Sequence, residues 1–586
     1  MIKIFKNLEK KGFIIIFFVM ILVIFSVFLE LKIPEYMSEI TKLVQTESST
    51  MKEILLTGSH MIICAVSSLA CTIIIGYLTS VLAARFSRSI RRKIFAKVED
   101  FGIAEIKKFQ TSSLITRTTN DVTQIEMLLA MGLQMIIKAP VMAIWALSKI
   151  IGKSGELSII TAIGVVIIVV TNLIIISIVS PRFSKIQKLT DKINGVTREN
   201  ITGIQVIHAF NAEDFQENRF DNVNQELTGI HMRITKTFAL MDPVMNFVMH
   251  FQHLAIYIVG AFLILRCSML DKITMFSDMV VFSSYGMQVI ISFLLLTFIF
   301  MVAPRAQVSA KRINEVLEEE ISLKNGTFNG KTEEKGTIEF KNVSFKYPDA
   351  DEYVLKDISF KVEKGETIAF IGSTGSGKST LINLVPRLYD VSDGEVLVDG
   401  INVKEYNTKA LNNKIGYISQ TPVMFTGSVQ ENVSYGDNGR KKPNKKKIIE
   451  AIEVAQAKEF VEKMENKYDS HIARGGTNIS GGQKQRLSIA RAIARDPEIY
   501  IFDDSFSALD YQTDLTLRQK LKKYTKNATS MIVAQRIGTI MNADKILVLD
   551  KGKCVGFGTH KELLNSCEIY KEIALSQLSE EELKHA

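Results

Sequence analysis

The chain has 586 residues, of which 47% are hydrophobic, and its formal net charge at pH 7 is +9. This length exceeds what one hydrophobic core accommodates, so at least two domains are expected. The basic residues cluster beside long apolar runs and do not form one basic patch interleaved with aromatic residues. We therefore predict no nucleic-acid partner and attribute the charge to membrane topology.

Six apolar segments lie in the first half, each close to the roughly 20 residues that a helix needs to cross a bilayer. Their approximate cores are residues 12–28, 61–84, 128–150, 157–179, 244–265 and 279–302. The links after the second and fourth segments are long and polar, which predicts helices that continue into solvent. The first half is therefore predicted to be an all-α membrane domain.

Basic residues flank these segments on one side, as the positive-inside rule requires of cytoplasmic ends. We therefore expect both termini and the long links in the cytoplasm. The residues concerned are Lys3, Lys6, Lys10, Lys11, Arg85, Arg88, Arg91, Arg92, Lys93, Lys97, Arg182, Lys185, Lys188, Lys192, Arg305, Lys311 and Arg312.

Few ionisable residues lie inside the predicted spans. Lys138 in the third span and His250 and His253 in the fifth could line a substrate path, because buried charge in lipid usually faces a cavity. The alternative is that they reach toward the interface or satisfy backbone carbonyls. None of the three is assigned to a substrate site.

The second half begins after a charged linker. We place the membrane domain at residues 1–318, the linker at 319–336 and a soluble α/β domain at 337–586, because alternating apolar residues begin a strand at Ile338.

A phosphate-binding loop follows a buried strand in this second domain. Glycines at its turns let backbone N–H groups converge on phosphates at a helix N-terminus, so the motif predicts ATP binding. Lys378 would reach the β- and γ-phosphates, and Ser379 would hold Mg²⁺ together with Asp503 at the end of the apolar strand 499–502. The loop residues are Gly372, Ser373, Thr374, Gly375, Ser376, Gly377, Lys378, Ser379 and Thr380.

The segment Ile479-Ser-Gly-Gly-Gln483 precedes Asp503 by about twenty residues and resembles the LSGGQ signature of ABC proteins. With it, nearly the whole chain resembles an ABC exporter of the multidrug type. The resemblance implies that Ser480, Gly481, Gly482 and Gln483 contact ATP bound to an opposing domain, and hence a dimer. It also implies that segments 113–122 and 200–220 are intracellular loops whose short coupling helices dock on an ATPase domain.

Further positions match the family in order. Tyr347 resembles the aromatic residue that stacks on adenine, and Gln420 resembles the Q-loop glutamine that links Mg²⁺ to the membrane domain. Asp510, in Ser507-Ala-Leu-Asp510, resembles the D-loop aspartate.

Two positions at the predicted hydrolytic site depart from the family pattern. Asp504 stands where a glutamate normally orients or deprotonates the attacking water, so the base is one methylene short. Gln535 stands where the switch histidine is expected, and an amide carries neither proton nor charge. With these changes the chain resembles the degenerate-site subunit of heterodimeric bacterial ABC exporters. The predicted catalytic residues are Asp504, Gln535 and Gln420.

The sequence thus predicts a six-helix transmembrane domain fused to an ABC ATPase domain, with ATP and Mg²⁺ as cofactors. The expected function is export of a small amphipathic compound or drug across the cytoplasmic membrane with a second half-transporter, and the composition is typical of a bacterial protein. One alternative is a self-sufficient homodimer that exports a lipid, peptide or drug. A second is a nucleotide-sensing regulatory subunit.

Overall fold

The computed structural model describes residues 2–46, 49–151, 154–266, 269–439 and 442–578. The chain forms two compact units. The first comprises Met1–Glu99 and Gln110–Glu319, and the second comprises Asp100–Phe109 and Glu320–Ala586.

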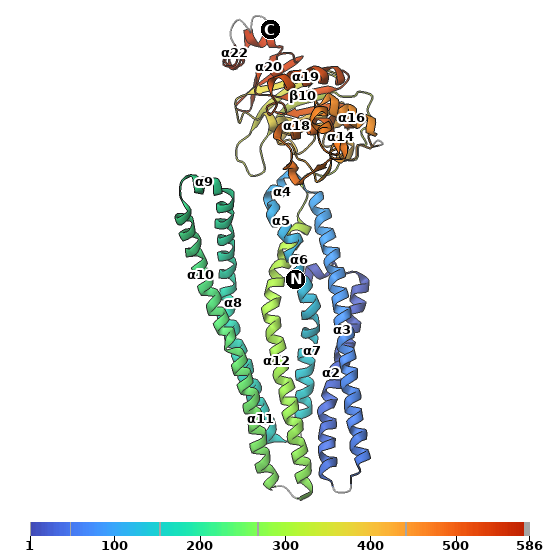
Figure 1. Cartoon of the computed structure of the whole chain (residues 1–586), viewed down its shortest axis with the longest axis vertical. Coiled ribbons are helices and arrows are strands. Elements are labelled where there is room, and N and C mark those ends of the chain that lie inside the picture. Colours follow the sequence, from blue (N-terminus) through green and yellow to red (C-terminus); the bar gives the residue numbers. More distant parts are fainter. Residues whose placement is uncertain (1, 47–48, 152–153, 267–268, 440–441, 579–586) are drawn as a thin grey trace. The chain divides into compact units, whose positions relative to one another are not determined.

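The described part of the first unit is helical, and six of its helical stretches are long and apolar enough to cross a membrane, as predicted (Figure 1). The stretches are Lys10–Gln45, Met51–Glu99, Thr111–Ile150, Gly155–Val179, Glu213–Arg266 and Lys272–Glu318. Their elements are α2 (Lys10–Gln45), α3 (Met51–Glu99), α5 (Thr111–Thr118), α6 (Asn120–Met127), π-helix η1 (Leu128–Gly132), α7 (Leu133–Ile150), α8 (Gly155–Thr202), α10 (Glu213–Ala239), α11 (Met241–Arg266) and α12 (Met269–Glu318), with α1 (Ile2–Phe5) before them.

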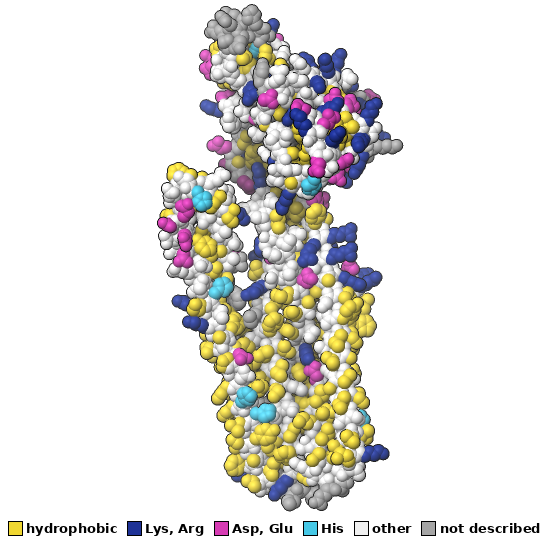
Figure 2. Space-filling model, in the orientation of Figure 1, with side chains coloured by type: hydrophobic (Ala, Val, Ile, Leu, Met, Phe, Trp, Pro, Cys, Tyr) yellow, Lys and Arg dark blue, Asp and Glu magenta, His cyan; other side chains and the backbone are white. Residues whose placement is uncertain are grey.

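Helices α3 and α8, like α12, are much longer than a bilayer is thick. Helices α3 and α8 have 49 and 48 residues, and at about 1.5 Å per residue each exceeds the roughly 30 Å of hydrocarbon that a membrane presents. The prediction that the links after the second and fourth spans continue as helix is therefore confirmed. The surface of this unit is rich in hydrophobic side chains, and charged side chains are sparse over much of it (Figure 2).

Ion pairs join α2 to α7 within the helical unit. Lys138 Nζ lies 2.7 Å from Glu30 Oε1, and the two side chains are 22% and 20% exposed. The hydroxyls of Ser26 and Ser68 donate to the same Glu30 oxygen at 3.3 and 3.2 Å. Lys138 is thus neutralised by a carboxylate, whereas the sequence had left open a substrate path or a contact with the interface or backbone.

Pro34 interrupts the hydrogen-bonding ladder of α2. It has no N–H to donate to the carbonyl of Glu30, four residues earlier. Gln288 Nε2 of α12 donates to that carbonyl at 3.4 Å, and the Tyr285 hydroxyl donates to the neighbouring carbonyl of Leu31 at 2.8 Å. Side chains of the sixth stretch therefore donate hydrogen bonds to backbone carbonyls of the first stretch near Pro34.

In the first loop, the stretch that packs with the second unit lies earlier in the chain than the predicted segment. Segment 113–122 falls in α5 and α6, which belong to the helical unit. The stretch that packs with the second unit is Asp100–Phe109, which contains α4 (Ile103–Phe109). In the second loop, the short helix α9 (Ile204–Ala209) lies within the predicted segment 200–220.

The second unit contains a four-stranded sheet in the order β2-β1-β4-β5 and a six-stranded sheet in the order β12-β11-β3-β10-β9-β6. The strands are β1 (Ile338–Phe345), β2 (Leu355–Val362), β3 (Thr367–Gly372), β4 (Asp393–Val398), β5 (Ile401–Asn402), β6 (Ile415–Ile418), β9 (Ile499–Asp503), β10 (Thr529–Val533), β11 (Lys545–Asp550) and β12 (Lys553–Gly558); β7 (Gly427–Ser428) pairs with β8 (His471–Ile472). The helices are α13 (Lys378–Asn383), α14 (Thr408–Lys414), α15 (Val429–Val433), α16 (Lys445–Val454), α17 (Lys458–Glu462), α18 (Gly481–Arg495), α19 (Tyr511–Tyr524), α20 (Ile537–Ile540), α21 (His560–Ser566) and α22 (Glu568–Leu575).

Strand β3 is central in the larger sheet and is buried on both faces. Ile368 and Phe370 belong to a core shared with β1 and β2, whereas Ala369 and Ile371 pack in a core with α21 and α22. A continuous apolar run of this kind is typical of a parallel strand covered on both sides.

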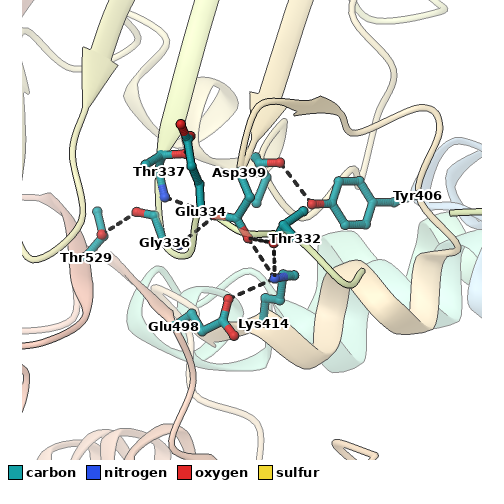
Figure 3. Close-up of polar contacts among 10 residues, drawn as sticks. Thr332, Glu334, Gly336, Thr337, Asp399, Tyr406, Lys414, Glu498 and Thr529 are labelled. Carbon is teal, nitrogen blue, oxygen red and sulfur yellow. Dashed lines mark hydrogen bonds and ion pairs between the residues drawn. The ribbon is translucent and has the colours of Figure 1, made fainter. Parts of the chain in front are cut away.

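A buried ionic cluster fixes the linker to the second unit (Figure 3). Lys414 Nζ contacts Asp399 Oδ2 at 2.7 Å and Glu498 Oε2 at 2.9 Å. The other oxygen of Asp399 accepts the backbone N–H groups of Gly336 and Thr337 at 2.6 and 3.0 Å. The side chain of Asp399 is fully buried and that of Lys414 is 8% exposed, so the end of the linker is held by charges that have little access to water.

Candidate functional site

The predicted ATP-site residues gather at one edge of the six-stranded sheet. Strands β3, β10 and β9 are adjacent and parallel, and Val533 pairs with both Phe370 and Asp503. Residues that follow the carboxyl ends of these strands therefore lie together, which is where open α/β sheets bind ligands. The phosphate-binding loop follows β3, Asp504 follows β9 and Gln535 follows β10.

Glycine geometry shapes the loop between β3 and α13. Gly372 has φ of +152°, and a Cβ there would lie 2.0 Å from the carbonyl oxygen of Leu549. Gly377 has φ of +100°, and its Cβ would meet Leu355 Cδ2 at 2.8 Å. Neither position accommodates a side chain, so the loop keeps a bare backbone at the start of α13.

Lys378 folds back over this loop. Its Nζ donates to the carbonyls of Gly372 and Ser373 at 2.8 and 2.7 Å and lies 3.4 Å from Ser376 Oγ. Burial lowers the pKa of Lys378, which the nearby carboxylates of Asp504 and Asp503 oppose. The ammonium group is therefore positioned to exchange loop carbonyls for phosphate oxygens.

Ser379 and Asp503 meet at the predicted metal position. Ser379 Oγ donates to Asp503 Oδ1 at 2.7 Å, and burial raises the pKa of Asp503 above its ordinary value. A hydroxyl and a carboxylate oxygen are hard ligands of the kind that Mg²⁺ takes beside phosphate oxygens.

Asp504 and Gln535, the two departures from the family pattern, contact each other. Gln535 Nε2 donates to Asp504 Oδ2 at 2.9 Å, and the Asp504 backbone N–H donates to the Val533 carbonyl at 3.1 Å. Asp504 has φ of +46°, a left-handed conformation that aspartate tolerates better than most residues. Burial raises the pKa of Asp504, although the Gln535 bond acts in the opposite direction.

Tyr347 lies beside the loop, and Gln420 lies on an exposed segment. The Tyr347 hydroxyl is 2.9 Å from Thr380 Oγ1, so the ring is tied to the start of α13. Gln420 is exposed two residues after β6, which pairs with β9. Among the described residues, no hydrogen bond joins its side chain to Ser379 or Asp503. The remaining loop positions, Thr374 and Gly375, are solvent-exposed.

The signature segment caps α18. Ser480 Oγ accepts the backbone N–H of Gln483 at 3.3 Å, and Gln483 Oε1 accepts that of Ser480 at 2.9 Å, a reciprocal capping box. Gly481 has open space where a Cβ would be, and a Cβ on Gly482 would meet the Ala508 carbonyl oxygen at 3.2 Å. The capping bonds hold the two side chains and leave a helix N-terminus bare of bulky groups.

Asp510 caps the next helix, α19. Its side chain accepts the backbone N–H of Thr513 at 2.9 Å, and this bond lowers the pKa of the carboxyl. The structure thus gives Asp510 a capping role, and the D-loop role implied by the resemblance stays a prediction.

Sequence reasoning missed two residues that support the site. Gln577 lies after α22; its Nε2 donates to the Gln535 carbonyl at 2.8 Å, and its Oε1 accepts the N–H of Ile537 at 2.8 Å. Ser505 is fully buried, and its hydroxyl donates to the Ile418 carbonyl at 3.2 Å. Ser505 follows the two aspartates and could have been suspected, but no local pattern marks Gln577.

Together these features define a P-loop nucleotide-binding domain carried on the same chain as a helical membrane unit. Residues 355–507 match the family of ABC transporters, and residues 16–293 match the ABC transporter transmembrane region. The chain belongs to the ABC transporter family, so it is a multi-pass membrane ATPase of the transporting class.

Relatives and a solved structure agree with this assignment. The chain is 38% identical over 512 residues to an uncharacterized ABC transporter ATP-binding protein of Mycobacterium bovis, with 86% of each covered. It is 31% identical over 511 residues to an ATP-dependent lipid A-core flippase of Haemophilus ducreyi, again with 86% of each covered. A bacterial Atm1-family ABC exporter with ATP bound shares the fold, with a TM-score of 0.82 at 20% identity, over 97% of this chain and 100% of that one.

Proposed function

We propose that the chain is one half of a heterodimeric ATP-driven exporter in the cytoplasmic membrane of a bacterium, with both termini and the ATPase domain in the cytoplasm. Its own ATP site binds nucleotide and hydrolyses it slowly. Its signature residues Ser480, Gly481, Gly482 and Gln483 complete the faster site of the partner half-transporter.

One observation carries the proposal of a slow site, namely the contact of Gln535 with Asp504 at 2.9 Å. A shortened carboxylate is bonded to an amide that can neither take up a proton nor carry a charge. The water-activating pair is therefore weak. The phosphate-binding loop and the signature helix keep the geometry that nucleotide binding needs.

Each predicted site residue has its own role in holding ATP. Backbone N–H groups of the loop and of the start of α13 would receive the phosphates, and Lys378 would neutralise charge that develops during transfer. Tyr347 would stack on adenine. Ser379 and Asp503, already 2.7 Å apart, would hold Mg²⁺ with Gln420, and the ion would draw charge from the phosphate oxygens.

For the cargo we propose a small amphipathic compound or drug, which is the expectation carried over from multidrug-type exporters. A second candidate is a homodimeric lipid exporter. It is favoured by the similarity to the Haemophilus ducreyi protein, whose name states that it flips lipid A-core.

The test is the rate of phosphate release by the purified chain alone, with its partner, and with Asp504→Ala in each case. A heterodimer predicts turnover that depends on the partner and changes little with Asp504→Ala. Fast turnover by the chain alone that is lost in Asp504→Ala would refute the heterodimer and favour the homodimer.

A further inference from the structure

A segment that interrupts the membrane unit packs with the ATPase domain. Residues Asp100–Phe109 follow α3 in the chain and precede α5, yet they belong to the same compact unit as Glu320–Ala586. Helix α4 therefore packs in the ATPase unit, and the chain joins it directly to α3 and α5 of the membrane unit.

Glu105 anchors the start of α4. Its Oε2 accepts the N–H of Gly102 at 2.8 Å and its Oε1 accepts the N–H of Ser322 at 3.1 Å, while the residue is only 5% exposed. A Cβ on Gly102 would lie 2.9 Å from Glu105 Oε2, so the turn needs glycine. The first turn of α4 is thus tied to the linker of the ATPase domain.

Lys107, one half-turn further along α4, lies against Tyr347. Its Nζ is 5.1 Å from the centre of the Tyr347 ring, within the range of a cation–π contact. The ring itself is held by the bond to Thr380 and by edge contacts with Phe345 and Tyr389, whose centroids lie 5.0 and 5.2 Å away. A fixed aromatic ring with the Lys107 cation over it therefore lies beside the phosphate-binding loop.

The spacing leaves no room for a base between the cation and the ring. A stacked base needs roughly 3.5 Å on each of its faces, or about 7 Å in all. The observed separation is 5.1 Å. A base that stacks on this face of Tyr347 has to displace the ammonium group of Lys107.

Space beside the ring permits such a movement. A cavity of about 280 Å³ is bordered by Tyr347, Tyr389, the first residues of α4 and the linker residues Ser322 and Leu323. Ile103 and Ala104 of α4 pack against the same core as Tyr347, whereas Lys107 itself is exposed. Its displacement breaks the cation–π contact with Tyr347.

We propose that Lys107 competes with the adenine base for the face of Tyr347, so that ATP binding breaks the contact between α4 and this ring. Loss of nucleotide lets the cation return to the ring. Because α4 is joined to α3 and α5, binding of the base changes a contact of the segment between these two helices. The hydrogen bonds of Glu105 hold the start of α4 in both states. The inference rests on the proposed stacking role of Tyr347.

The test compares equilibrium binding of ATP and of inorganic tripolyphosphate, which has no base. The full-length purified protein is used without divalent cations, so that hydrolysis does not intervene. Lys107→Met removes the charge and keeps most of the stem, and Lys108→Met is the matched control, because Lys108 is also exposed and lies over Phe109 in its own helix. We expect Lys107→Met to tighten ATP binding about two- to fivefold relative to Lys108→Met, the size of an exposed cation–π contact.

Tripolyphosphate separates competition for the ring from a general effect of charge. Removal of a positive charge leaves tripolyphosphate binding unchanged or weaker, so the ratio of ATP to tripolyphosphate affinity rises only in Lys107→Met. An unchanged or lower ratio in that variant overturns the proposal; a lower ratio would mean that Lys107 supports the ring from behind. Tyr347→Ala tests the premise separately, since ATP binding that survives this change removes the stacking role whatever Lys107 does.

Discussion

Replacement of Asp504 by glutamate should accelerate hydrolysis at this chain's own ATP site. Asp504 directly follows β9, and its backbone N–H is bonded to the Val533 carbonyl at the end of β10, so the change lengthens only the side chain, by one C–C bond of about 1.5 Å. An error of about 1 Å in a reacting group costs on the order of a hundredfold in rate, or about 2.7 kcal/mol.

The backbone conformation sets a limit on this gain. Asp504 has φ of +46°, and a left-handed conformation costs a longer side chain on the order of 1 kcal/mol more than aspartate. Subtracting this cost leaves about 1.7 kcal/mol, which corresponds to roughly a twentyfold increase. Asp504→Glu combined with Gln535→His should be faster still, because histidine can carry the charge that the amide cannot.

The assay is steady-state phosphate release at saturating MgATP, with the partner's own catalytic carboxylate replaced so that only this site contributes. Asp504→Asn serves as the control, because it keeps the size of the side chain and removes the base. The reasoning is refuted if Asp504→Glu is no faster than the natural chain, or if Asp504→Asn matches Asp504→Glu.

Two further predictions concern buried charge. Lys414→Met should leave Asp399 and Glu498 unpaired and destabilise the ATPase domain by about 3 kcal/mol, lowering its Tm by roughly 6–12 °C in thermal unfolding. Lys361→Met, which breaks the exposed pair with Glu363, should shift Tm by less than about 2 °C, and equal shifts would contradict the reasoning. Lys138→Met should destabilise the membrane unit in lipid nanodiscs by about 3 kcal/mol, because Glu30 loses its partner within the helical unit. The double variant with Glu30→Gln and Lys138→Met should recover most of that lost stability. If it is no more stable than Lys138→Met alone, the ion pair does not account for the stability of these helices.

The ATP site could be predicted from sequence because its parts are local. The phosphate-binding loop is one continuous stretch, and Asp503 and Asp504 follow a recognisable apolar strand. Parallel pairing of β3, β10 and β9 then brings these stretches together with no further information. The contact between Asp504 and Gln535 follows from the same register.

Long-range pairings could not be predicted in this way. Glu30 lies 108 residues from Lys138, and neither residue has a local pattern that names the other. The segment that packs with the ATPase domain is Asp100–Phe109, slightly earlier than the segment 113–122 singled out by resemblance. Its position depends on Glu105 meeting the N–H of Ser322 in the linker, 217 residues away, which no periodicity reveals.

The proline in α2 imposes an order on biosynthesis. The carbonyl of Glu30 loses its helical partner at Pro34, and the Gln288 side chain that replaces it lies 258 residues later in the chain. At about 5–20 residues per second, a ribosome needs roughly 13 to 50 s to make that length. A carbonyl without a partner in lipid costs several kcal/mol. The Glu30 carbonyl of the first membrane helix therefore has no Gln288 donor until the last membrane helix is synthesised. During that time water, lipid headgroups or the insertion machinery has to donate a hydrogen bond to it.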